Sequence, residues 1–479
     1  MTDDRWRSPL GSRYASPAMQ RLWGEPHRIG LWRRAWLALA ESERELGLEI
    51  PEQALAEMRA HLDDADLGVA AEYERRFRHD VMAHVHHFGD QAPTARAFLH
   101  LGATSAFVTD NADLLVMRDG LRLLLGRLLG VLNSLAAFAE RHAAEPCLAY
   151  THFQPAQLTT VGKRATLWMQ DFAVDAEEIC LRIETMRLRG CKGTTGTQAS
   201  FLELFKGDHA KVRELDRRVA ERLGVPRTWP VTGQTYTRKA DSLVLDALSG
   251  VAQSAAKMAG DLRLLQHEGE LLEPFESEQI GSSAMAYKRN PMRAERISGL
   301  ARFVMSLQAN TTQTAASQWL ERTLDDSANR RLTLPEGFLA TDAVLILAAN
   351  IAGGIEVRSE VIRQHVAVQM PFMATERWLM LGASAGGDRQ ALHEVVRRHS
   401  LAVAEQVGRG GINDLMDRLS ADAAFARIPA AALKAELDPV KYTGRAREQV
   451  AEFLAEFARP LMARARPLAM TPDVAEVRV

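Results

Sequence analysis

A seven-residue repeat of apolar side chains sets the strongest constraint on how this chain can fold. The repeat consists of two interleaved rows, which are Leu114, Leu121, Leu128 and Leu135, and Met117, Leu124, Val131 and Phe138. This spacing places both rows on one stripe of an α-helix. The repeat begins just after Asp110 and Asn111, two residues that often cap helices, and ends before Pro146. It predicts a helix of about 30 residues, on the order of 45 Å long.

Four further long helices are expected. Apolar seams run through residues 158–186 and 244–265, and helical stretches follow at 292–319 and 338–351. Alternating β-branched segments bounded by turns are scarce, so strands are not expected. Long helices bury their apolar stripes best against one another, which predicts an all-α protein with a central long-helix bundle. Because the seams occupy more than one face, an oligomer is also expected.

The length and the change in helix character predict three domains. At 479 residues the chain is too long for one ordinary core. The helices before residue 104 and after about residue 357 are shorter and more polar. We therefore expect an N-terminal helical domain over 1–104, the long-helix bundle over 105–357, and a C-terminal helical domain over 358–479.

Composition argues against several classes of protein. Lys+Arg 59 against Asp+Glu 61 gives a net charge of -2, so no nucleic-acid partner is expected. Three scattered cysteines argue against a disulfide framework and a zinc ribbon, and fit a reducing compartment. The first residues are polar, and the longest apolar run, 338–351, is too short to span a membrane. A soluble cytoplasmic protein without a membrane partner is expected.

The segment Gly-Ser-Ser-Ala-Met-Ala-Tyr-Lys-Arg-Asn-Pro at 281–291 carries the most chemistry. Gly281 gives the backbone freedom beside two hydroxyls, Ser282 and Ser283, and Lys288 and Asn290 follow. A mobile loop with a hydroxyl, a cation and an amide suits closure over an anionic substrate. The alternative is an ordinary polar loop between two helices.

A basic segment around Arg78, His79 and Asp80 also suits an anion. Guanidinium groups bind phosphate or carboxylate through two parallel hydrogen bonds. His84 and His87 have the helical spacing of metal ligands, but no carboxylate-rich motif accompanies them, so no metal site is expected. A solvated basic helix face is the alternative.

Two polar clusters lie near the ends of long helices. Thr104 and Ser105 could cap the first long helix or donate hydroxyls to a carboxylate at its N-terminus. His152 lies in a tight, proline-bounded connection between helices, where it could act as a general acid or base, or cap a helix.

Two segments have phosphate-binding character. Residues 193–200 are rich in glycine and threonine, but they lack the Gly-Lys-Ser/Thr ending of a P-loop, which argues against ATP hydrolysis. Arg322, Ser327 and Arg331 could jointly bind a phosphate, with Asp325 or Asp326 holding the arginines.

Taken together, these clusters resemble one family. The loop at 281–291 is similar to the signature of the fumarase/argininosuccinase superfamily. Five further segments, in the same order along the chain, look specifically like the adenylosuccinate lyase family. They are Arg13-Tyr14, Arg78-His79-Asp80, the Thr-His-Phe-Gln-Pro run at 151–155, the run 233–239 that contains Gln234, and 321–331. The resemblance covers roughly residues 10–450 and implies a fumarase/aspartase-like fold.

The resemblance implies β-elimination of fumarate from adenylosuccinate, giving AMP, and from succinylaminoimidazole carboxamide ribotide. It implies Ser282 as the base and His152 as the general acid. Glu295 would orient the imidazole and keep it protonated, while Lys288 stabilises the carbanion charge. No metal and no organic cofactor is implied.

The remaining implied site residues contact the substrate or assist the catalytic groups. Ser283 stands beside the base, Asn290 holds developing charge, and His79 is a second catalytic candidate near the phosphate. The implied nucleotide contacts are Arg13, Tyr14, Arg78, Asp80, Arg296, Arg322, Ser327 and Arg331. Thr104, Ser105 and Gln234 would contact the succinyl and base portions.

The resemblance also implies a homotetramer whose active sites are each built from three subunits. Two alternatives remain: another fumarate-releasing lyase, such as one acting on argininosuccinate, and a non-catalytic helical scaffold. Argininosuccinate carries no phosphate, so Arg322 and Arg331 argue against the first. Intact Ser282, Lys288 and His152 argue against the second.

One position departs from the family pattern. Ala286 stands where the pattern has proline. Proline would restrict the backbone of the loop, so alanine is expected to alter loop closure without removing a chemical group.

Overall fold

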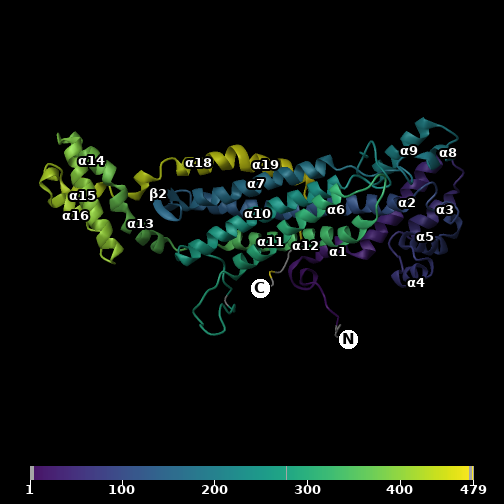
Figure 1. Cartoon of the computed structure of the whole chain (residues 1–479), viewed down its shortest axis with the longest axis horizontal. Helices are drawn as coiled ribbons and strands as arrows, with labels where there is room; N and C mark the ends of the chain where they lie inside the picture. The colour runs from purple at the N-terminus through teal and green to yellow at the C-terminus, as the bar shows by residue number, and fades with distance from the viewer. Residues whose placement is uncertain (1–4, 277, 474–476, 478–479) are drawn as a thin grey trace.

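The computed structural model describes residues 5–276, 278–473 and 477. The described chain is an elongated, predominantly helical molecule containing nineteen α-helices and two small β-sheets. Figure 1 shows the long helices in the middle, with α3, α4, α5, α8 and α9 at one end and α14, α15 and α16 at the other. The predicted all-α class is confirmed.

Five long helices form the central bundle. They are α6 (Ser105–Arg141), α7 (Val161–Thr185), α10 (Lys239–His267), α11 (Met292–Ala316) and α12 (Asp325–Gly354). Helix α10 packs on α7, α11 and α12, and α6 packs on α7 and α12. All four leucines of the seven-residue repeat in α6 are buried within this core, because the stripe faces the neighbouring helices.

The first long helix is longer than predicted. Helix α6 begins at Ser105 and has 37 residues, so Asp110 and Asn111 lie inside it instead of capping it. The Asp110 carboxylate accepts hydrogen bonds from Arg238, and the Asn111 amide bonds to the backbone of Phe107 and Gly190. Buried partners from other segments therefore satisfy side chains that the sequence alone assigned to a helix start.

Two bundle helices, α6 and α12, are apolar and long enough to cross a membrane when judged by length and composition alone. In the described structure, however, 67% and 72% of the residues in their most apolar windows are buried. Their apolar character is accounted for by their place in the bundle core.

The N-terminal end of the rod consists of short helices. Its elements are α2 (Glu25–Glu45), α3 (Glu52–Ala60), α4 (Leu67–Phe77), α5 (Asp80–Gln91) and η2 (Pro93–Ala95). The preceding η1 (Leu10–Tyr14) and α1 (Pro17–Trp23) pack on the central bundle. Two helices from later in the chain, α8 (Ala199–Leu204) and α9 (His209–Arg222), share the buried core of this end. This end is therefore built from two stretches of sequence far apart in the chain.

The C-terminal end has its own small core. It contains β4 (Glu356–Val357), α13 (Ser359–Met373), α14 (Thr375–Ser384), α15 (Arg389–Gly408), α16 (Leu415–Ala421), η3 (Ala423–Phe425), α17 (Ala430–Ala435) and η4 (Pro439–Tyr442). The chain then returns along α7 through α18 (Ala446–Glu452), η5 (Phe453–Ala458), α19 (Arg459–Ala465) and η6 (Arg466–Leu468). The three-domain division at 104 and 357 stays a prediction.

The connection between α6 and α7 is a β-hairpin, which the sequence did not predict. Strands β1 (Pro146–Thr151) and β2 (Gln154–Thr160) pair antiparallel, and His152 and Phe153 form the turn with φ of 52° and 57°. A second small pair joins β3 (Leu271–Leu272) to β4. The hairpin was missed because Ala, Gln and Pro interrupt its β-branched pattern.

Candidate active site

Residues from three separate segments meet at the N-terminal end of the bundle. His79 is the N-cap residue of α5, and its Nε2 lies 3.3 Å from the Ser105 hydroxyl at the start of α6. Asp80 accepts a hydrogen bond of 3.0 Å from Arg331 on α12, although 251 residues separate them. The structure thus brings together His79, Asp80, Ser105 and Arg331, which were predicted from three different motifs.

The neighbouring predicted residues occupy the ends of the same helices. Arg78 follows α4 in a left-handed conformation with φ of 57°, and Thr104 is the N-cap residue of α6. Ser327 lies in the first turn of α12. The Gln234 N–H donates to the Glu321 carbonyl at 2.9 Å, which places Gln234 beside Arg322. Asp326 accepts from Arg322 at 2.8 Å, as predicted for one of the two aspartates.

A second group lies near the start of α11. The Arg296 guanidinium stands 5.5 Å from the centre of the Tyr14 ring, a cation–π arrangement. Tyr14, Glu295 and Arg296 line a cavity of about 470 Å³. Arg13 precedes Tyr14 in the same helical turn, η1. The structure therefore joins the Arg13-Tyr14 motif to residues just past the signature loop.

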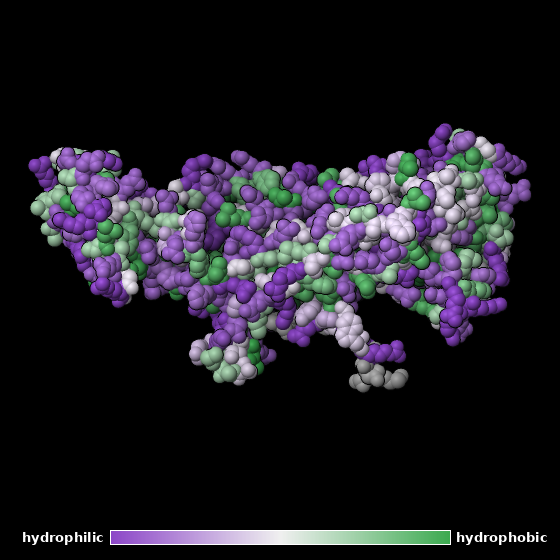
Figure 2. Space-filling model, in the orientation of Figure 1, coloured by the Kyte–Doolittle hydropathy of each residue, from purple (hydrophilic) through white to green (hydrophobic). Residues whose placement is uncertain are grey.

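The signature loop at 281–291 is closed at its base and open elsewhere. The Asn290 amide donates to the Gly281 carbonyl at 2.7 Å. Ser283 and Lys288 are exposed, and Tyr287 is 84% exposed. Figures 1 and 2 show this loop projecting from the bundle, with apolar side chains at its surface.

The Ser282 side chain is bonded within its own loop. Its hydroxyl oxygen accepts hydrogen bonds from the N–H groups of Ala284 at 3.3 Å and Met285 at 3.1 Å. A neutral hydroxyl accepts such bonds as readily as an ionised one. These contacts therefore orient the Ser282 side chain and do not by themselves make it a base.

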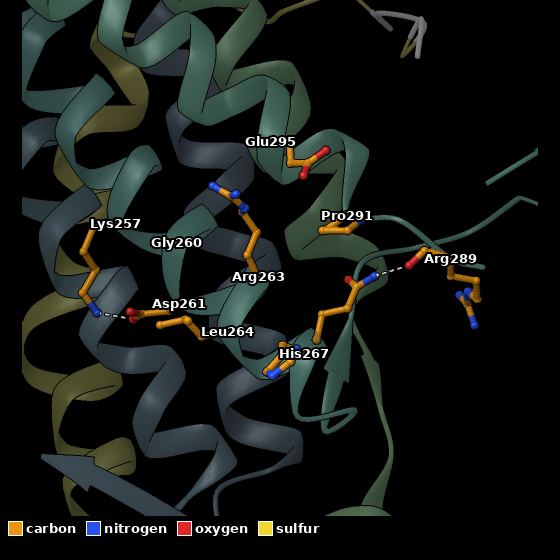
Figure 3. A pocket seen from close by; sticks show the side chains of 10 residues that line it. Lys257, Gly260, Asp261, Arg263, Leu264, His267, Arg289, Pro291 and Glu295 are labelled. Atoms are coloured by element: carbon orange, nitrogen blue, oxygen red, sulfur yellow. Dashed lines mark hydrogen bonds and ion pairs between the residues drawn. The ribbon is translucent and has the colours of Figure 1, made fainter. Parts of the chain in front are cut away.

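A larger cavity of about 810 Å³ lies beside the loop, along α10 (Figure 3). The Gln266 amide spans one edge and donates to the Arg289 carbonyl at 2.9 Å. Glu295 borders both cavities. The other charged or titratable residues along this wall are Lys257, Asp261, Arg263, His267 and Arg289.

His152 stands exposed at the tip of the hairpin, away from the first group. Helix α6, with Ser105 at its start, has 37 residues and ends before the hairpin, so about 55 Å of helix separates them. Helix α11 ends at Ala316, 21 residues after Glu295, so about 32 Å of helix separates Glu295 from the segment that carries Arg322. One chain therefore distributes the predicted residues over different places and does not assemble them into one site.

The predicted pairing of Glu295 with His152 does not occur within one chain. In the described residues, no hydrogen bond or ion pair joins the two side chains. Glu295 lies with Tyr14 and Arg296, because all three line the cavity at the start of α11.

Sequence reasoning missed a buried carboxylate that fixes the end of the signature loop. Glu273 accepts hydrogen bonds from the N–H groups of Arg293 and Ala294, both at 3.0 Å, and so caps α11. Burial raises the pKa of Glu273. No local pattern could reveal this cap, since Glu273 lies about 20 residues before the helix it caps.

The histidines weighed as metal ligands have other surroundings. The buried His84 ring packs edge-on against Trp32, and burial lowers its pKa to about 4. The His87 Nε2 accepts the Asp66 N–H at 2.9 Å. Across the residues that the structure describes, no group of three or more His, Cys, Asp or Glu is placed to hold a metal ion.

Solved structures define the class of this fold. The chain superposes on a 3-carboxy-cis,cis-muconate lactonizing enzyme from Pseudomonas putida with a TM-score of 0.81, at 24% identity over 95% of this chain and 99% of that one. A fumarate lyase from Mesorhizobium sp. BNC1 gives a TM-score of 0.78 at 24% identity, over 92% of this chain and 98% of that one. The Lyase family model matches residues 22–306. The protein is therefore a member of the lyase class with the fumarase-type fold.

Sequence relatives narrow the class to one family. The adenylosuccinate lyase of Saccharomyces cerevisiae is 49% identical over 455 residues, and that of Schizosaccharomyces pombe is 48% identical over 457 residues. Each match covers 94% of both chains. The model of the adenylosuccinate lyase C-terminus matches residues 371–453. The chain belongs to the adenylosuccinate lyase family.

Proposed function

We propose that this protein cleaves adenylosuccinate to AMP and fumarate, and succinylaminoimidazole carboxamide ribotide to its carboxamide product and fumarate. The observation that carries the proposal is identity of 49% and 48% to two adenylosuccinate lyases, with 94% of each chain covered. The signature loop, which departs from the family pattern at Ala286 and keeps its polar groups, supports it. The joining of His79, Asp80, Ser105 and Arg331 supports it as well.

In the proposed elimination, Ser282 acts as the base. Its alkoxide removes a proton from the carbon beside a carboxylate, and the electron pair forms the double bond of fumarate as the C–N bond breaks. His152 gives a proton to the departing nitrogen. Lys288 and Asn290 stabilise the charge that develops on the carboxylate. A free serine hydroxyl is too weak a base, so closure of the loop would have to place Ser282 in a positively charged pocket that excludes water.

The binding roles are proposed from position. Arg322 and Arg331, with Ser327, would hold the phosphate, supported by Arg78, His79 and Asp80. Thr104, Ser105 and Gln234 would contact the succinyl and base portions from the same end. Near the start of α11, three further residues would contact the nucleotide: Arg13, Tyr14 and Arg296.

We propose that the protein is a homotetramer with active sites shared between subunits. Separation of the site residues along α6 and α11 supports sharing, because a complete site needs both ends of the bundle. An apolar row on α7 supports association: Leu167, Val174 and Leu181, spaced seven residues apart, are 46%, 55% and 42% exposed. A cytoplasmic location is proposed as well, in keeping with three buried free cysteines.

Fumarate release is the direct test of the reaction. Purified protein would be mixed separately with adenylosuccinate, the succinylated carboxamide ribotide and argininosuccinate. We expect fumarate from the first two and none from the third. Release from argininosuccinate alone would assign the chain to another elimination, and no release from any substrate would indicate a non-catalytic scaffold.

Mixing two inactive variants tests the shared site. Ser282→Ala and His152→Gln each remove one proposed group, and a mixed oligomer can contain sites that keep both. We expect partial recovery of activity after the variants are dissociated and reassembled together. If mixed oligomers form and are verified but recover no activity, the proposal that each site is built from several chains is contradicted.

A further inference from the structure

A network of buried charged side chains lies beneath the cluster of predicted site residues at the N-terminal end of the bundle. The reaction steps proposed above do not use it. It joins α6, the segment before α10, the first turn of α10 and the start of α12. Its members are Asp110, Asp113, Tyr236, Arg238, Asp241, Asp326 and Arg330. Buried charges are costly unless they are paired, so a network of this size indicates a structural or functional requirement at this place.

Arg238 connects the two sides of the network. Its Nε donates to Asp326 at 2.7 Å, and its Nη2 donates to Asp110 at 3.1 Å. The Arg238 side chain is 2% exposed and that of Asp326 is 0% exposed. Only a planar guanidinium can bridge two carboxylates in this fixed geometry.

Asp326 also bonds to Arg322, which lies nearer the surface. Its second carboxylate oxygen accepts from Arg322 at 2.8 Å, and the Arg322 side chain is 26% exposed. A relay therefore runs from Asp110 through Arg238 and Asp326 to Arg322. The Arg322 guanidinium is held on one side by Asp326, and its other N–H groups are left for solvent or substrate.

The same relay fixes the segment that carries Gln234. Asp110 accepts from the Tyr236 N–H at 3.0 Å, two residues beyond Gln234. The Gln234 N–H is bonded to Glu321, the neighbour of Arg322. Asp110 itself lies five residues after Ser105 on α6. Three segments with proposed substrate contacts are thus joined through one buried cation.

We propose that Arg238 and Asp326 are positioning residues that hold Arg322 in place for the substrate phosphate. This inference rests on the proposed function. With Asp326 in place, Arg322 enters the complex already oriented, so less side-chain freedom is lost when phosphate binds. Without it, Arg322 must be ordered by the phosphate itself. The loss should fall on binding of the phosphate and leave proton transfer at the succinyl group unchanged.

Comparing two substrates tests this role. One is adenylosuccinate, and the other is the same molecule without its phosphate, succinyladenosine. For Asp326→Asn, we expect the ratio of kcat/KM between the two to fall about tenfold, the effect of one charge-assisted hydrogen bond. The kcat for succinyladenosine should not change. Arg322→Ala should lower the ratio by at least as much, and adding Asp326→Asn to it should have no further effect.

A second variant and a control keep the test decisive. Arg238→Lys retains the charge but loses the bridging geometry, and should lower the same ratio if Asp326→Asn does not fold. Glu43→Gln changes another buried carboxyl, in the core of the N-terminal helices, and should leave the ratio unchanged. An unchanged ratio in a folded relay variant, or equal losses for both substrates, would overturn the positioning role. If the unaltered protein cleaves neither substrate, the proposed function itself fails.

Discussion

The two parts of the proposed site differ sharply in how firmly they are held. At the N-terminal end, Arg331 is bonded to Asp80 and Arg322 to the buried Asp326. In the loop at 281–291, by contrast, side-chain bonds hold only the base, through Asn290 and Arg289, and Tyr287 is 84% exposed. Binding groups are built into the helices, whereas the proposed base is carried on a projecting segment.

This difference has a physical reason. A phosphate is recognised best by donors that are already oriented, because ordering them during binding costs free energy. A serine base instead needs a dry and positively charged surrounding, which an exposed loop lacks. If Ser282 is the base as proposed, the loop would close over the substrate before proton transfer, while the N-terminal end of the bundle would not need to move.

Removing the proposed base should have the largest effect. Ser282→Ala deletes the group that takes the proton, and we expect kcat to fall roughly 10³-fold with little change in KM. Steady-state fumarate release measures both constants. A variant that keeps most of its turnover would show that another group is the base. The division between a catalytic loop and a binding site at the N-terminal end of the bundle would then fail.

Weakening the fixed end should raise KM more than it lowers kcat. Asp80→Asn removes the charge that pairs with Arg331, whose side chain is 56% exposed. Solvent screens this pair, so we expect a rise in KM of about three- to tenfold and a small change in kcat. Salt titration of KM provides a control, since the difference between the proteins should shrink at high ionic strength. A fall in kcat alone would place Asp80 in the chemical step.

Stiffening the loop tests its mobility. Ala286 is exposed, and proline in its place fixes φ in the open and closed states alike. We expect Ala286→Pro to change kcat about two- to fivefold and to reduce proteolysis within the loop. Ala286→Gly is the matched control, with the opposite effect on loop order. No change in turnover or loop order in either variant would contradict a gating role for this position.

The helices and the site differ in how far the sequence could predict them. The repeat in α6 and the seams of α7 and α10 follow from local periodicity, so the bundle was predicted. The partners of Asp110 were not, because Arg238 lies 128 residues away and sequence spacing carries no such contact. The Glu273 cap was missed for the same reason. The His152 hairpin is a local structure and was missed because Ala, Gln and Pro interrupt its β-branched pattern. The family motifs named the site residues, but only the structure shows that one chain separates them.

The smallest effect on activity is expected at Glu43, which lies in the core of the N-terminal helices. Neither of its carboxyl oxygens has a hydrogen-bond partner among the described residues, and burial raises the pKa of Glu43 from 4.5 to about 9. The unfolded chain ionises above about pH 4.5 while the folded protein keeps the proton, so this residue lowers stability progressively as pH rises from about 4.5 to about 9.

Glu43→Gln keeps the shape and removes this ionisation. We expect it to increase the free energy of unfolding by on the order of 2 kcal/mol at pH 8 and by less than about 1 kcal/mol at pH 5. Urea unfolding at both pH values measures the difference, and fumarate release should show unchanged kcat and KM. A gain in stability that is equal at the two pH values would mean that the Glu43 carboxyl does not stay protonated. A change in KM would mean that the substrate-binding residues at the N-terminal end of the bundle depend on packing in this core. Their own ion pairs would then not be enough to hold them in place.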